Sequence, residues 1–286
     1  MTVKRAIGHT RGRTVNGDAR YRRRFRTTRL IAGFMAGSAV AFGVFTIVFG
    51  IVAESQRIHG FHNVVVAALL LVLSAPPAFA IARRPDRSDA PLMTLTVLSV
   101  AALITMAAGL TIDPFTLPFV VFTGVLWTVR PSKEPTGHHE RPSWGLLLLV
   151  VAGAVPLIVY ALGQAELQRT LAGDEHSRFF HWVEASFYTT GILFLGLLSA
   201  LRPVSHRMAG FSAGLGLIIF GLAAMFLGGY ASSVSAPWSW LALTGGLAFI
   251  WLGAREGVVS RARHVPDWAV RSTTVFHRPR RARERT

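Results

Sequence analysis

The 286-residue sequence has no cysteine, only two lysines and few charged residues of any kind. The absence of cysteine excludes disulfides, thiolate-ligated zinc, iron–sulfur clusters and cysteine nucleophiles. Charged residues make up 15% of the chain, whereas about 25% is typical of soluble domains. The sequence also has no Walker A loop and no H-E-x-x-H. These absences argue against the common soluble enzyme classes.

Apolar residues dominate the chain, at 51% of the sequence with a mean hydropathy of +0.44. Eight apolar runs recur along it, at residues 30–53, 64–82, 92–112, 115–129, 144–165, 182–201, 208–231 and 238–254. A membrane-spanning helix needs about 20 residues, and six of the runs reach that length comfortably. The runs also lack the polar residue at every third or fourth position that a soluble helix shows. The sequence therefore predicts an all-α integral membrane protein, an eight-helix transmembrane bundle.

The basic residues give an independent test of this topology, because the net charge of +16 is unevenly placed. Of the 30 basic residues, 27 fall in the terminal segments and in every second loop, at residues 1–29, 83–90, 130–143, 202–207 and 255–286. Basic loops stay on the cytoplasmic side, so both termini are expected to be cytoplasmic. This sorting disfavours nucleic acid as the partner of the basic residues.

A repeated motif suggests that the chain consists of two related halves. Residues 53–57 read Ala-Glu-Ser-Gln-Arg and residues 165–169 read Ala-Glu-Leu-Gln-Arg, while residues 61–62 and 180–181 are both Phe-His. The matches fall at equivalent places in a four-plus-four arrangement of spans. Because four spans is an even number, both halves would insert in the same orientation, as parallel repeats do.

This reading divides the chain into five segments. They are a basic cytoplasmic N-tail at 1–29, a first four-helix repeat at 30–130, a linker at 131–143, a second four-helix repeat at 144–254 and a basic cytoplasmic C-tail at 255–286. Arginine-rich tails of this kind are attracted to anionic lipid headgroups.

Polar residues at the ends of the spans on the outer side are the candidate site. His181, Glu184 and Tyr188 are spaced i, i+3, i+7, so they project from one stripe of a helix. Glu184 lies inside an apolar run, where an ionisable residue is costly and points to function. The predicted ligand-binding residues are His181, Glu184, Tyr188, His62, Glu54 and Glu166.

Histidines near these residues raise the question of a metal ion. The candidates are His59, His62, His176 and His181, and imidazole suits zinc, copper or iron. No histidine motif of a known metal site is present, however, and the five-residue step from His176 to His181 places the two rings on different faces of a continuous helix. A metal site is therefore a secondary hypothesis, and no cofactor is predicted.

The sequence favours a non-enzymatic protein of the bacterial cytoplasmic membrane that binds or transports a small ligand. The expected pocket lies between the two halves and faces outward. Two alternatives stay open: a structural or assembly subunit of a membrane complex, and a membrane enzyme that uses metal, haem or quinone at the His/Glu cluster. Membrane-protein partners or a homo-oligomer are compatible with each of these readings.

Overall fold

The computed structural model of the protein describes residues 3–52, 59–131, 141–171, 173–201 and 206–263. Side chains are described for residues 18–50, 52, 59–131, 141–171, 173–201 and 207–255. In chain order the elements are α1 (Val3–Val52), α2 (Gly60–Ala68), a π-helical turn η2 (Leu69–Ser74), α3 (Ala75–Arg83), a 3₁₀ turn η3 (Pro85–Arg87), α4 (Asp89–Ala108), α5 (Leu117–Val129), α6 (Trp144–Thr170), α7 (Glu175–Arg178), α8 (His181–Leu201), α9 (His206–Phe226) and α10 (Ala236–Arg263).

The protein is all-helical, as the sequence predicts, and no strand occurs in the described residues. Within the part of the chain that the structure describes, six helical segments are long and apolar enough to cross a membrane. They are Asp18–Gly50, Gly60–Arg83, Asp89–Ala108, Trp144–Thr170, His181–Leu201 and Arg207–Phe226. The short run at 115–129 forms α5, an apolar helix of 13 residues. The run at 238–254 lies in α10.

The second span is continuous from α2 to α3, and two adjacent prolines explain its π-helical turn. Pro76 and Pro77 have no N–H group, so the backbone carbonyls one turn earlier lose their helical partners. The hydroxyl of Ser212 on α9 donates to the carbonyl of Val72 at 3.0 Å, and Ser74 donates to the carbonyl of Leu69 at 2.9 Å. Side chains thus satisfy backbone groups that have no water to bond within a membrane.

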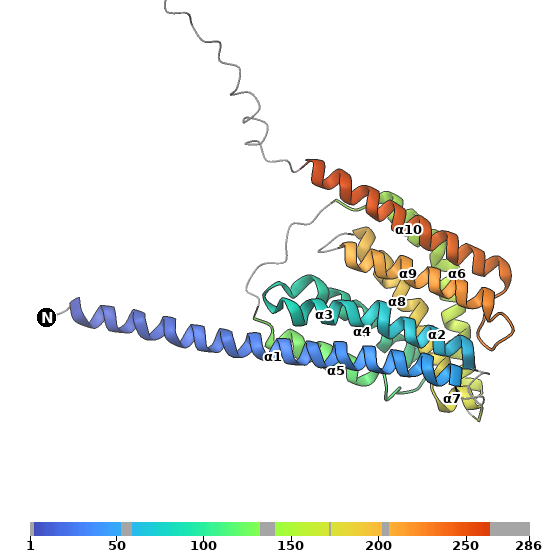
Figure 1. Cartoon of the computed structure of the whole chain (residues 1–286), viewed down its shortest axis with the longest axis horizontal. Helices are drawn as coiled ribbons and strands as arrows, with labels where there is room; N and C mark the ends of the chain where they lie inside the picture. Colours follow the sequence, from blue (N-terminus) through green and yellow to red (C-terminus); the bar gives the residue numbers. More distant parts are fainter. Residues whose placement is uncertain (1–2, 53–58, 132–140, 172, 202–205, 264–286) are drawn as a thin grey trace, which may run out of the picture.

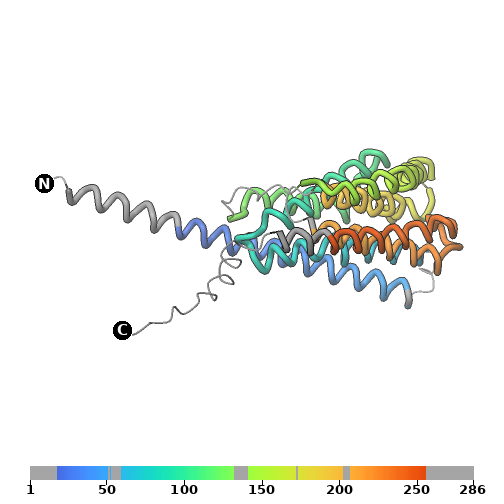
Figure 2. Tube along the Cα trace, turned by 90° about the horizontal axis from the view of Figure 1, so that it is seen from above, coloured from blue at the N-terminus to red at the C-terminus, as the bar shows by residue number. Residues whose placement is uncertain are grey.

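The long helices run along one common direction and alternate in sense, so their connections gather at two ends of a bundle (Figures 1 and 2). We call the end that carries α7 the α7 end; there α1 ends, and α2, α8 and α10 begin. α8 occupies the middle, in contact with α2, α4, α6 and α9. Helices from the first and second halves of the sequence meet where α2 contacts α8 and α9 and where α4 contacts α8.

Two apolar clusters form the interior. The larger draws on α2, α4, α8 and α9 around Leu73, Leu98 and Ile192, and the smaller joins α1, α3, α4 and α5 around Ile81 and Leu95. α9 and α10 approach closely through glycine: a methyl group on Gly246 would lie 2.6 Å from the carbonyl oxygen of Gly214. Small residues commonly permit such contacts between membrane helices.

Candidate metal centre

Four histidines from three separate elements meet at the α7 end. His59 immediately precedes α2, His62 lies in the first turn of α2, His176 lies in α7, and His181 is the first residue of α8. One ring nitrogen from each side chain lies within 4.8 Å of the others. They are all the histidines whose side chains the structure describes, and we refer to them as the four-histidine cluster.

The rings pack tightly and are largely shielded from solvent. His59 and His62 are buried, His176 is 9% exposed and His181 is partly buried. The ring centroid of His59 lies 4.4 Å from that of His176 and 4.6 Å from that of His181. His62 stacks on His181 at 5.1 Å with an interplanar angle of 19°. These two stacked residues are the ones that match in the two halves of the sequence.

A turn between α7 and α8 explains how His176 reaches the cluster. Phe180 adopts φ 61°, a left-handed conformation that is uncommon for a residue other than glycine. It ends α7 and starts α8 in a new direction, so His176 and His181 do not lie on one continuous helix. The sequence-based argument that their five-residue step separates them is therefore wrong, because it assumed helix throughout.

Five ring nitrogens of the cluster are buried without a hydrogen-bond partner. They are Nδ1 and Nε2 of His59, Nδ1 of His62, Nε2 of His176 and Nδ1 of His181. A buried polar atom without a partner costs roughly 1–3 kcal/mol, and buried nitrogens of this kind are normally satisfied. Each imidazole therefore has at least one nitrogen available to bind an ion held between the four rings.

The protonation of His176 follows from its contact with Asp174. Nδ1 of His176 lies 3.0 Å from a carboxylate oxygen of Asp174, and that oxygen also accepts from the backbone N–H of His176 at 3.0 Å. An ionised carboxylate only accepts, so Nδ1 carries a proton, and in the neutral imidazole Nε2 is the nitrogen with the lone pair. A carboxylate behind a histidine is the usual support of a metal-bound imidazole.

A second chain of hydrogen bonds fixes His62. The hydroxyl of Ser232 donates to Oε1 of Gln164, and Oγ of Ser232 lies 2.9 Å from Nε2 of His62. Since the single hydroxyl proton is used on Gln164, Nε2 of His62 is the donor in this contact. Nδ1 of His62, which is buried and has no partner, then presents its lone pair.

The pKa shifts of His59 and Asp174, at the edge of the cluster, agree with a neutral imidazole beside an ionised carboxylate. Burial lowers the pKa of His59, and the neighbouring His176 lowers it further. Desolvation raises the pKa of Asp174, but the hydrogen bonds and charge of His176 outweigh this and hold that pKa below its usual value. His59 is thus kept neutral and Asp174 ionised near neutral pH.

The donor set fits a transition-metal ion. Four imidazoles are typical ligands of zinc, copper or nickel rather than of magnesium or calcium, which prefer oxygen. Zinc–nitrogen bonds of about 2.0–2.1 Å place tetrahedral ligands roughly 3.3 Å apart. The ligand atoms here lie within 4.8 Å of one another, so small side-chain rotations close the difference.

Glu184 lies one helical turn from His181 but faces a different environment. Its carboxyl group is 6% exposed and lines a cavity of about 650 Å³ between α1, α2, α5 and α8. Phenylalanines form much of that cavity, among them Phe42, Phe119 and Phe187. Asp113 is the acidic group whose charge acts on Glu184. Burial raises the pKa of Asp113, and hydrogen bonds from Thr116 and the backbone lower it in part.

The other predicted ligand-binding residues take separate positions. Tyr188 is fully buried, and its hydroxyl donates to the carbonyl of Gly216 on α9 at 2.8 Å. Glu166 is exposed and forms an ion pair with Arg169. Glu54 lies outside the described residues. The structure therefore brings His62 and His181 together and places Glu184, Tyr188 and Glu166 elsewhere.

Three supporting residues had no place in the sequence-based site. Asp174 carries a recognisable signal, because it caps α7 two residues before His176. Gln164 and Ser232 have no such signal, since Ser232 is 170 positions from the histidine that it contacts.

Comparison of the chain with protein-family models, with curated proteins and with solved structures gave no match. The site is therefore interpreted from its own geometry.

Proposed function

We propose that this is a polytopic membrane protein that binds one divalent transition-metal ion, zinc or copper, in the four-histidine cluster. The observation that carries the proposal is the convergence of four imidazoles with unpartnered nitrogens within 4.8 Å. Asp174 and Ser232 support the ligands from behind. The proposal takes up the metal ion that the sequence offered only as a secondary hypothesis, and the proposed role is binding rather than catalysis.

The proposal includes eight spans, with both termini in the cytoplasm and the α7 end outside a cell membrane. Alternation of the helices between two ends supports the count, because α5 and α10 lie alongside the six longer apolar segments. The concentration of basic residues in loops at the opposite end supports the orientation. An outward site would take its ion from outside the cell. The basic tails would contact anionic lipid.

The proposal also keeps the four-plus-four duplication. α2 and α8 are the second helices of their halves, and α9 and α4 are the third helices. The contacts of α2 with α9 and of α4 with α8 are therefore equivalent under an exchange of halves. His62 and His181 hold matching positions and stack on each other. On this reading each half contributes ligands, so the ion binds between the halves.

Calorimetric titration of the purified protein in detergent tests the metal proposal. We expect one Zn²⁺ or Cu²⁺ per chain, no binding of Mg²⁺, and loss of the site when His59→Ala and His176→Ala are combined. Glu166→Gln is the matched control, because Glu166 belongs to the same end but is exposed and paired with Arg169. A stoichiometry near zero, or equal binding by the double variant and the wild type, would contradict the proposal.

A further inference from the structure

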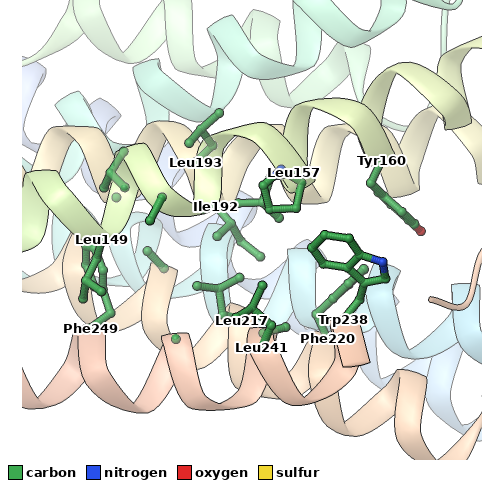
Figure 3. Close-up of a pocket in the computed structure, with 18 of the residues that line it drawn as sticks. Leu149, Leu157, Tyr160, Ile192, Leu193, Leu217, Phe220, Trp238, Leu241 and Phe249 are labelled. Carbon is green, nitrogen blue, oxygen red and sulfur yellow. The ribbon is translucent and has the colours of Figure 1, made fainter. Parts of the chain in front are cut away.

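A cavity of about 830 Å³ lies between α6, α8, α9 and α10, apart from the metal centre (Figure 3). Its volume is in the range of small-molecule sites, roughly 300–1,000 Å³. Leu149 and Phe249 line one end and Tyr160 and Trp238 line the other, with Ile192 and Leu217 between them. No acidic, basic or histidine side chain is among its lining residues.

The cavity opens sideways, onto the surface of helices that cross the membrane. Val155 on α6 is 68% exposed, Val159 is 65% exposed and Leu241 on α10 is 53% exposed. In a bilayer this rim meets hydrocarbon rather than water, because α6 is one of the apolar spanning segments. An apolar cavity does not retain ordered water, so a hydrocarbon chain from the bilayer is the natural occupant.

One end of the cavity is polar and adjoins the metal centre. The hydroxyl of Tyr160 donates to the backbone carbonyl of Ser232 at 2.8 Å, and the hydroxyl of Ser232 contacts His62. Tyr160 can still accept a hydrogen bond, and Trp238, which lines the same end of the cavity, carries an indole N–H. From Leu149 to Tyr160 the helix advances about 16 Å, which is long enough to hold an extended chain below a head group.

We propose that this cavity binds an uncharged lipid, with its hydrocarbon tail along α6 and a hydroxyl-bearing head group, of the alcohol or hydroquinone type, between Tyr160 and Trp238. The head group would then be linked to the four-histidine cluster through Tyr160 and Ser232. A charged head group is excluded from this position, because no lining side chain offsets its loss of hydration. Binding of the lipid does not require a bound metal ion.

Two glycines on α6 provide a matched pair of variants. Gly153 lines the cavity and Gly163 does not, and a methyl group added at either position meets nothing within 4 Å. Gly153→Leu therefore adds a side chain at the cavity wall where a Cβ atom has room, whereas Gly163→Leu adds the same side chain to the same helix elsewhere. Zn²⁺ titration of both variants tests the metal centre independently of the labelling.

Photolabelling in phosphatidylcholine nanodiscs tests the proposal, with a hexadecanol probe that carries a diazirine in mid-chain. We expect labelled peptides from the facing walls of α8, α9 and α10. The yield should fall at least about tenfold in Gly153→Leu, as loss of some 1.4 kcal/mol of binding would produce, and stay unchanged in Gly163→Leu. Excess unlabelled hexadecanol should compete, and excess phosphatidylglycerol should not.

Equal labelling of the two leucine variants would overturn the proposal, since the probe would not be in the cavity. Competition by phosphatidylglycerol as effective as by hexadecanol would also overturn it, because the site would then accept any bilayer chain. If Zn²⁺ binding is absent while labelling follows the expected pattern, the metal centre fails and the lipid site stands. If labelling fails while Zn²⁺ binds, the opposite holds.

Discussion

His181 and Glu184 are one turn apart on α8, yet they belong to two different regions of the molecule. His181 joins three other imidazoles, where several buried nitrogens have no partner and Asp174 and Ser232 hold the rings. Glu184 faces a phenylalanine-lined cavity, and the other acid near it is Asp113. The first region brings imidazole nitrogens together, whereas the second surrounds the carboxyl group of Glu184 with apolar side chains. Adjacency on a helix face therefore does not define a shared site; the neighbouring helices do.

The largest expected effect separates these two residues directly. His181→Gln removes an imidazole from the cluster, and we expect the affinity for Zn²⁺ to fall more than ~100-fold, beyond the loss typical of supporting residues. Glu184→Gln keeps all four ligands, and its affinity should stay within about twofold of the wild type, which is a difference of some 0.4 kcal/mol. Calorimetric titration measures both. A comparable loss in the two variants would mean that both regions form one site.

An intermediate effect is expected at the support of His176. Asp174→Asn removes the carboxylate that orients the ring and keeps Nδ1 protonated, so Zn²⁺ affinity should fall about 10–100-fold. Glu175→Gln is the control, because Glu175 is the next residue and is exposed. Competition with a chromophoric chelator measures the affinities of both variants. Equal affinities would show that the Asp174 contact only caps α7.

The smallest effect concerns stability near the Glu184 cavity. Burial raises the pKa of Asp113 above its unfolded value, so the folded state binds protons more readily and loses stability as the pH rises through that region. Asp113→Asn removes this loss. Melting temperatures from pH 4 to pH 7 should decline for the wild type relative to the variant, while Zn²⁺ binding at pH 7 stays the same. Parallel melting curves would show that burial of Asp113 has no such cost.

The sequence predicts the parts of this protein that depend on local pattern. Runs of apolar residues identify the helices, and the repeated Phe-His pair identifies two residues that meet across the bundle. The π-helical turn is harder to predict from Pro76 and Pro77 alone, because its form also depends on a hydrogen bond from Ser212 on another helix. Element existence thus follows from composition, while details of the backbone depend on distant partners.

The four-histidine cluster could be predicted only in part, for a similar reason. The step from His176 to His181 counts against a metal site only if a helix continues through Phe180, and a left-handed residue at that position has no clear sequence signal. Ser232 and Gln164 support His62 from far along the chain. Glu184 was grouped with His181 from helical spacing alone, although tertiary packing directs it into another cavity.

X-ray absorption spectroscopy of the purified, zinc-loaded protein tests the central claim most directly. The four-histidine cluster predicts a first shell of nitrogen atoms at about 2.0–2.1 Å, with the outer-shell scattering of three or four imidazole rings. The signal should lose one imidazole in His181→Gln and none in Glu184→Gln. A shell dominated by carboxylate or water oxygen, without imidazole scattering, would contradict the account.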